Sequence, residues 1–164
     1  MMEMDERYVR QDRLRYTKNT VSSRLAILAI LFDVLFFVSI YKSDVGSWYY
    51  TILIGASILY NLVFMLLAFL SSEGVKRYKP GFSWLLIALG AIQVVRIFIL
   101  PMSANRAELE LKGETVRVMG DAQFIRCVIY LCVSSAACIA AAVINLGKSR
   151  MLKAHLARLG SRQA

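Results

Sequence analysis

An apolar run over residues 25–41 carries one carboxylate, Asp33, at its centre. The other residues of the run are apolar or small, and this composition predicts a helix that lies in lipid. A charged side chain at the centre of a membrane-spanning helix costs about 2.5–3.5 kcal/mol on insertion scales. The remaining helices of the fold must therefore offer Asp33 a polar partner.

Three further apolar blocks accompany this run. Of the 164 residues, 58% are hydrophobic, whereas ordinary soluble domains contain about 45–50%. Each block approaches the roughly 20 residues that a helix needs to cross a hydrocarbon core about 30 Å thick. We therefore expect one all-α transmembrane domain over residues 21–146, a polytopic membrane protein folded as an antiparallel four-helix bundle. The predicted spans cover residues 21–41, 48–70, 82–100 and 124–146.

The outer loop, residues 101–123, is the longest segment expected between spans. Apolar and charged residues alternate on both sides of Gly113, which favours a short β-hairpin. A helix that begins at Ser103 or Asn105 fits almost as well, because Asn105 and Glu108 can form a capping pair. The sequence leaves both forms open.

Both ends of the chain are basic segments. Residues 1–20 form a charged lead, and residues 147–164 form a tail in which three leucines share one stripe. The tail is predicted to be an amphipathic helix that lies along the cytoplasmic headgroups. His155, the one histidine of the chain, has no acidic neighbour in the sequence and is expected at the protein surface.

Lysine and arginine are distributed unevenly over the segments that flank the spans. Of 20 such residues, 14 lie in the lead, the second loop and the tail when Arg24, at the start of the first span, is counted with the lead, and 4 lie in the first and third loops. Because cytoplasmic loops are enriched in Lys and Arg, this pattern places both termini in the cytoplasm. The basic residues expected to contact anionic headgroups or a partner protein are Lys76, Arg77, Lys79, Lys148, Arg150, Lys153 and Arg158.

Small residues mark the faces on which the spans are expected to pack. Ala26 and Ala29 share a helix face with Asp33, and Gly90 and Ala91 offer a second surface in the third span. The fourth span contains runs of serine and alanine. Small side chains allow two helix backbones to approach closely within a membrane.

Polar residues of all four spans fall at similar depths. At 1.5 Å per residue, one polar residue of each span lies about 12–15 Å below the outer boundary: Asp33, Ser57, Gln93 and Ser134. Arg96 lies about 7 Å deep, and its long side chain brings Asp33 within reach. We therefore predict that Asp33 pairs with Arg96 and that Gln93 bridges them. The expected intramembrane polar cluster comprises Asp33, Arg96, Gln93, Ser57, Asn61 and Tyr60.

No arrangement of residues points to catalysis. The sequence has no cluster of His, Asp and Glu, no nucleophile beside a base and no glycine-rich phosphate loop. Its 3 cysteines lack Cys-x-x-Cys spacing and are expected to be small apolar fillers. The formal net charge of +9 comes without a nucleic-acid recognition motif. We therefore predict no enzyme activity, no cofactor, no metal and no nucleic-acid partner.

Two classes of function remain. The polar interior, the small-residue fourth span and the basic cytoplasmic surfaces favour a non-catalytic subunit, or an accessory and assembly factor, of a larger membrane complex. The alternative is an oligomeric ion-coupled or proton-coupled transporter or channel that uses Asp33 and Arg96. Four helices enclose little space, so the alternative requires a homo-oligomer. We expect an integral protein of the plasma (cell) membrane, whose partners are lipid and another membrane or membrane-associated protein.

Overall fold

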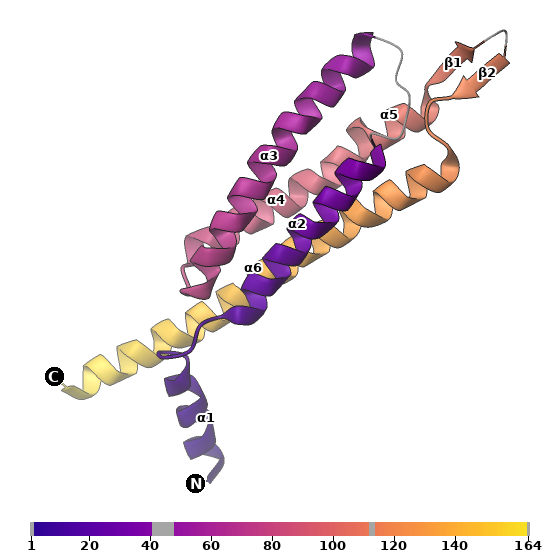
Figure 1. Cartoon of the computed structure of the whole chain (residues 1–164). Coiled ribbons are helices and arrows are strands. Elements are labelled where there is room, and N and C mark those ends of the chain that lie inside the picture. Colours follow the sequence, from indigo (N-terminus) through magenta and orange to yellow (C-terminus); the bar gives the residue numbers. More distant parts are fainter. Residues whose placement is uncertain (1, 41–47, 112–113, 164) are drawn as a thin grey trace.

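The computed structural model describes residues 2–40, 48–111 and 114–163 (Figure 1). Within these ranges, 4 helices are long and apolar enough to cross a membrane, which agrees with the number of such helices predicted. Lys42 and Lys112, two of the basic residues counted for orientation, lie outside the described residues. In chain order the elements are α1 (Met2–Arg13), α2 (Thr20–Ile40), α3 (Trp48–Lys76), α4 (Pro80–Ile99), α5 (Pro101–Arg106), β1 (Glu108–Leu111), β2 (Glu114–Arg117) and α6 (Asp121–Gln163).

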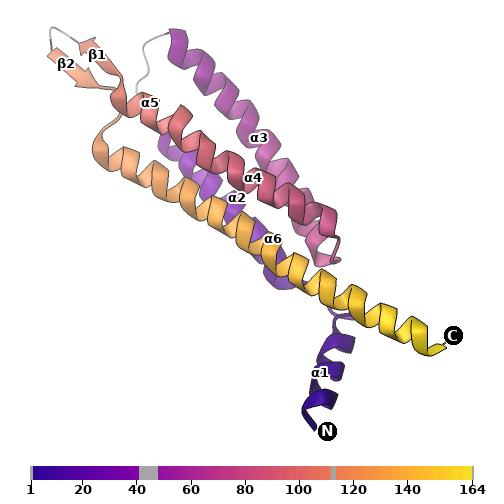
Figure 2. The same cartoon turned by 180° about the vertical axis from the view of Figure 1, so that it is seen from behind.

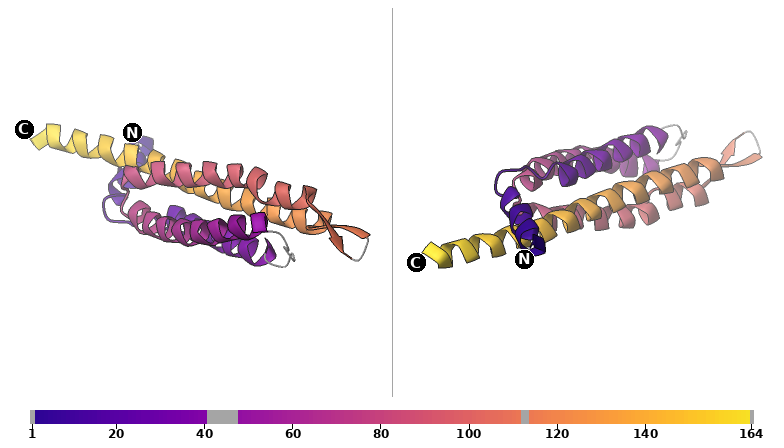
Figure 3. Two further views of the ribbon diagram at one scale, coloured as in Figure 1. Left: turned by 90° about the horizontal axis from the view of Figure 1, so that it is seen from above. Right: turned by 90° about the horizontal axis from the view of Figure 1, so that it is seen from below.

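The four long helices, α2, α3, α4 and α6, lie side by side, and each runs opposite to the long helix before it (Figures 1 and 2). Figure 3 shows them as two layers, α2 with α3 and α4 with α6. α6 packs against both α2 and α4, whereas α3 packs on α2 and less extensively on α4. Both chain termini lie toward one end of the molecule, here called the tail end, and the strands lie at the hairpin end (Figure 1).

A tight turn joins α3 to α4 at the tail end. Tyr78 has a φ of 55°, a left-handed conformation that is uncommon outside glycine. Pro80 then begins α4, where its missing N–H would have had no partner in any case. A Cβ atom at Gly74 would lie 2.2 Å from the ring of Phe82, so only glycine lets the two helices meet here. The predicted second loop is therefore shorter than expected, because α3 continues to Lys76.

Of the two forms that the sequence left open, the hairpin is the one observed. The helix expected to begin at Ser103 or Asn105 does not form, because a short helix already ends at Arg106 and Glu108 lies in a strand. The short helix α5 begins at Pro101, and the strands β1 and β2 then pair antiparallel, with Glu108 opposite Arg117. The N–H of Val118 donates to the carbonyl of Ala107 (3.0 Å), and the side chain of Asn105 donates to the carbonyl of Met119 (3.3 Å). These bonds attach the base of the hairpin to the end of α5.

α6 is one continuous helix of 43 residues, about 65 Å long at 1.5 Å per residue. Residues 147–163, here called the α6 extension, project past the other long helices (Figure 2). The tail is helical, as predicted, but it continues α6 without a break and does not form a helix of its own. The tail contains no proline, and an isolated glycine such as Gly147 costs a helix only about 1 kcal/mol relative to alanine, so nothing ends α6 there.

Two apolar clusters fill the interior between the four long helices. The tail-side cluster includes Phe64, Leu86 and alanines of α2, α3 and α6. The hairpin-side cluster includes Phe36, Leu100 and Leu131. Buried polar residues lie between the two clusters and again at the tail end.

Candidate functional site: a buried ion pair and the cavity beside it

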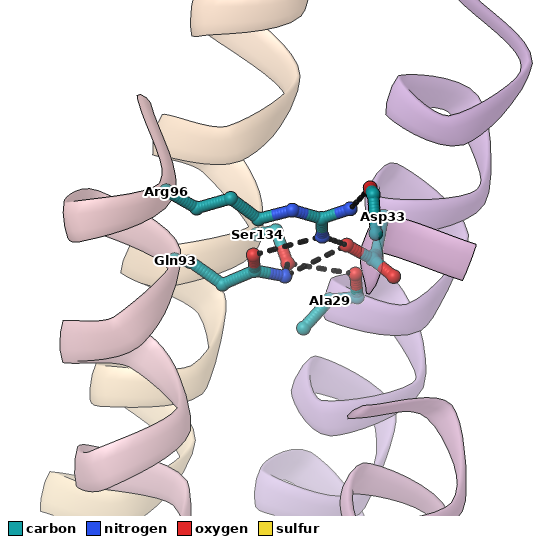
Figure 4. A network of polar contacts seen from close by, with 6 residues as sticks. Ala29, Asp33, Gln93, Arg96 and Ser134 are labelled. Carbon is teal, nitrogen blue, oxygen red and sulfur yellow. Dashed lines mark hydrogen bonds and ion pairs between the residues drawn. The ribbon is translucent and has the colours of Figure 1, made fainter. Parts of the chain in front are cut away.

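Asp33 of α2 and Arg96 of α4 form a buried ion pair (Figure 4). The Arg96 Nη1 atom lies 2.9 Å from Asp33 Oδ1, and the two side chains are 6% and 1% exposed. The long side chain of Arg96 therefore extends from α4 to the carboxylate that lies within the apolar run of α2. The structure thus brings together the two charged residues that the depth calculation paired.

Gln93 bridges this pair to α6. Its Nε2 atom donates to Asp33 Oδ1 at 2.8 Å and lies 3.4 Å from the hydroxyl of Ser134. The Ser134 hydroxyl in turn donates to the carbonyl of Ala29, one turn below Asp33 on α2, at 2.9 Å. Because Gln93 lies one helical turn from Arg96, both reach the same carboxylate oxygen (Figure 4).

The other side of the Arg96 guanidinium contacts α3. Its Nη2 atom donates to the hydroxyl of Ser57 at 2.7 Å. Its flat faces meet two aromatic rings, with centroids at 4.5 Å for Phe36 and 4.6 Å for Tyr60. A desolvated guanidinium over an aromatic ring is worth about 2 kcal/mol. The Asp33–Arg96 network, which comprises Asp33, Arg96, Gln93, Ser57 and Ser134, therefore ties all four long helices together.

Two predicted members of the polar cluster, Tyr60 and Asn61, form no side-chain hydrogen bond with the network among the described residues. Tyr60 contributes its ring to Arg96, but its hydroxyl has no hydrogen-bond partner among the described residues. Asn61 is 3% exposed, and neither its Oδ1 nor its Nδ2 atom is hydrogen-bonded to any described residue. Asn61 is thus buried near the network without belonging to it.

Asn61 and Asp33 line a common cavity between α2 and α3. The cavity has a volume of about 340 Å³, and its remaining lining is apolar, with Phe37 and Met65 among the side chains. Asp33 directs Oδ1 to Arg96, whereas its Oδ2 atom has no partner within the described parts of the chain. A smaller cavity of about 200 Å³ lies on the other flank of α3, where Tyr60 and Arg96 line it.

A second polar network at the tail end was missed by the sequence analysis. Asn19 donates to the hydroxyl of Ser22 (2.8 Å) and to the side-chain carbonyl of Asn145 (3.1 Å). Asn145 donates to the hydroxyl of Ser83 at 2.8 Å, and Lys148 donates to Asn19 at 3.1 Å. An amide within an apolar span, as at Asn145, was the signal that could have found this network.

His155 is buried beneath α1, so its prediction as a surface residue is wrong. It is 1% exposed, and its ring lies edge-on against Tyr8 with centroids 5.0 Å apart. Its Nε2 atom lies 3.2 Å from Oδ1 of Asp12, a residue 143 positions away in the chain. This hydrogen bond, with help from Arg15, lowers the pKa of Asp12 below its ordinary value.

The basic residues predicted to bind headgroups or a partner fall into two groups. Arg77, Lys79, Arg150, Lys153 and Arg158 are exposed around the tail end. Lys76 and Lys148 are half-buried and engaged within the molecule, because Lys76 forms an ion pair with Glu73 and Lys148 donates to Asn19. The five residues of the first group are therefore the ones whose side chains the tail end presents to a headgroup or a partner.

The described residues hold no group of three or more His, Cys, Asp or Glu side chains placed to bind a metal ion. No protein-family model, curated protein or solved structure matches the chain.

Proposed function

We propose that this chain is a non-catalytic subunit, or an accessory and assembly factor, of a larger complex in the plasma membrane. Its four long helices form an antiparallel bundle across the bilayer, and both termini are cytoplasmic. The excess of Lys and Arg in the lead, the α3–α4 turn and the tail supports this orientation. Anionic headgroups contact the exposed basic residues Arg77 and Lys79 of the α3–α4 turn.

The main support for this proposal is that apolar side chains lie on both sides of the Asp33–Arg96 network along the bundle. The network bonds the four helices to one another, and an apolar cluster separates it from each end of the bundle. The tail-side cluster also stands between it and the Asn19–Asn145 network, roughly 15–20 Å away along the helices. A polar layer of this kind fixes helix register but offers an ion or proton no continuous polar path through one chain.

The α6 extension supplies a surface for a partner. It projects past the other long helices, contacts α1 through His155, and exposes Arg150, Lys153 and Arg158. A helix that spans the bilayer and continues straight carries these charges away from the headgroups. They are then available to an acidic surface of a cytoplasmic or membrane-associated protein.

The test is purification of the tagged chain from its native membrane in a gentle detergent, followed by native mass spectrometry. A second, different polypeptide in a fixed molar ratio through two successive columns is the expected result. A complex that contains only copies of this chain would contradict the proposal.

A flux assay tests the transporter or channel alternative directly. Liposomes that contain only this chain should conduct protons and small ions no faster than protein-free liposomes. Flux that appears with the wild-type chain and is abolished by Asp33→Asn would overturn the accessory role, because it would assign Asp33 to a conduction path.

A further inference from the structure

The cavity between α2 and α3 is lined by apolar side chains except at two polar residues, here called the polar floor. Asp33 and Asn61 are the polar residues that line it, and Asp33 is fully buried while Asn61 is 3% exposed. Three side-chain atoms of these residues, Asp33 Oδ2, Asn61 Oδ1 and Asn61 Nδ2, have no hydrogen-bond partner among the described residues. Buried polar atoms normally have hydrogen-bond partners. Three such atoms without a described partner at one cavity therefore indicate that a bound molecule supplies the missing hydrogen bonds.

The rim of the cavity opens to the outer face of α2 and α3. Val38 and Leu62, both on its lining, are 55% and 56% exposed. These apolar side chains face the surroundings of the four-helix assembly, where the fold places lipid. An occupant therefore enters from the hydrocarbon phase and must itself be lipid-soluble.

The charge at the cavity favours a neutral occupant. Asp33 already shares its charge with Arg96, 2.9 Å from its other carboxylate oxygen. A cation in the cavity would lose its hydration and gain only a carboxylate that is already compensated. A pure hydrocarbon would leave the three polar atoms unpaired.

A hydroxyl group matches the chemistry of the floor. A carboxylate oxygen can only accept a hydrogen bond, whereas an amide nitrogen can only donate one. A hydroxyl does both at one atom. The volume of about 340 Å³ is near the lower end of ligand cavities, which run from about 300 to 1,000 Å³, and suits a single ring or a short branched segment.

We propose that this cavity binds a neutral, lipid-soluble alcohol or phenol, whose hydroxyl donates to Asp33 Oδ2 and accepts from Asn61 Nδ2. The site belongs to this chain alone and does not depend on the proposed accessory role. Its function is then to hold a small membrane-dissolved molecule against the second and third helices.

The test uses a matched pair of photoreactive probes in vesicles that contain only this chain. One probe is a benzyl alcohol that carries an aryl diazirine, and the other is the corresponding toluene, which lacks only the hydroxyl. Peptide mass spectrometry measures labelling of residues 34–38 and 58–65. Labelling at the exposed residues Val94 and Phe98 of α4, which line neither cavity, corrects for the partition of each probe into the membrane.

The corrected labelling of the cavity by the alcohol should exceed that by the toluene about three- to tenfold, the ratio that one or two net hydrogen bonds supply. Asn61→Leu should bring this ratio close to one. Tyr60→Phe is the matched control, because it removes an unpaired hydroxyl from the neighbouring cavity and should leave the ratio unchanged. Val38→Trp, which fills the rim, should reduce labelling by both probes.

Asn61→Leu should fold, because it removes an amide that bonds to no described residue. Its thermal unfolding midpoint should equal or exceed that of the wild type, which separates loss of the site from loss of the fold. Equal labelling of the wild-type cavity by the two probes, or an alcohol preference that persists in Asn61→Leu, would overturn the proposal. Protection of these residues from both probes in native membranes, but not in vesicles, would assign the groove to a partner helix and would also overturn it.

Discussion

Arg96 illustrates how a charge is held in an apolar interior. Its planar guanidinium uses one nitrogen for Asp33 and another for Ser57, and its faces lie on the rings of Phe36 and Tyr60. A compact ammonium on a flexible stem has no such planar fork, so lysine would keep the charge and lose most of these contacts. The position therefore requires arginine because of geometry as well as charge.

Loss of one member of the pair should cost more than loss of both. Asp33→Asn leaves the Arg96 guanidinium buried beside a neutral amide, and breaking a buried pair in this way costs about 3–5 kcal/mol. Adding Arg96→Gln removes the orphan charge and should restore part of that loss. Thermal or denaturant unfolding in detergent measures all four members of this double-mutant cycle.

Arg126→Gln is the control for these variants, because Arg126 is exposed and bonds only to a carbonyl of its own helix among the interactions described. It should change the free energy of unfolding by less than about 0.5 kcal/mol. If the losses from Asp33→Asn and Arg96→Gln simply add, the two residues are not coupled and the pair does not stabilise the fold as described.

At the scale of the helix, α4 and α6 lie in close contact at Gly90. A Cβ atom there would lie 3.2 Å from the carbonyl of Ser135 and 3.0 Å from Ile139. The Ser135 hydroxyl donates to the Gly90 carbonyl at 2.8 Å, and this bond requires the same close approach. Ala91, which the sequence also predicted at a packing surface, is exposed and does not take part.

Gly90→Leu should therefore separate α4 from α6 and lower the free energy of unfolding by about 1–3 kcal/mol or more, as overpacking of a filled interface does. Ala91→Leu adds the same side chain one residue away on the outward face and should leave the unfolding midpoint nearly unchanged. Chemical unfolding in detergent compares the two variants. Equal effects of both would contradict the packing described.

The docking of α1 on the α6 extension should respond to acid. Because the pKa of Asp12 in the fold lies below its ordinary value of about 3.9, its contact with His155 stabilises docking above that value. The contribution is lost as the pH falls through the lowered pKa and Asp12 takes up a proton. Spin labels at Val9→Cys and Met151→Cys should stay close from neutral pH to about pH 4 and separate below it.

Two variants check the cause of this separation. His155→Leu removes the hydrogen bond and should loosen α1 at every pH, whereas Asp12→Asn should abolish the acid response. A label distance that first lengthens near neutral pH in the wild type would mean that groups other than Asp12 control the docking.

At the scale of the whole molecule, the depth of a residue along a helix was predictable from the sequence. Contacts between residues far apart in the chain were not. A fixed rise per residue put Asp33 and Arg96 within reach of each other before any packing was known. His155 meets Asp12 across 143 residues, a contact that no local spacing encodes. The extent of α6 was missed because its tail was assigned to the membrane surface, although no residue in it ends a helix.

The membrane orientation is testable as a property of the entire chain. The hairpin and the α6 extension lie at opposite ends of the molecule (Figure 1), so the positive-inside pattern predicts that residue 108 lies outside the cell and residue 153 in the cytoplasm. Single cysteines at Glu108 and Lys153, in a background whose 3 native cysteines are replaced by alanine, report this directly. A membrane-impermeant maleimide should label Glu108→Cys in intact cells and Lys153→Cys only after permeabilisation, because the bilayer excludes the reagent. Labelling of Lys153→Cys in intact cells would reverse the orientation and move the basic α6 extension to the outer face, away from any cytoplasmic partner.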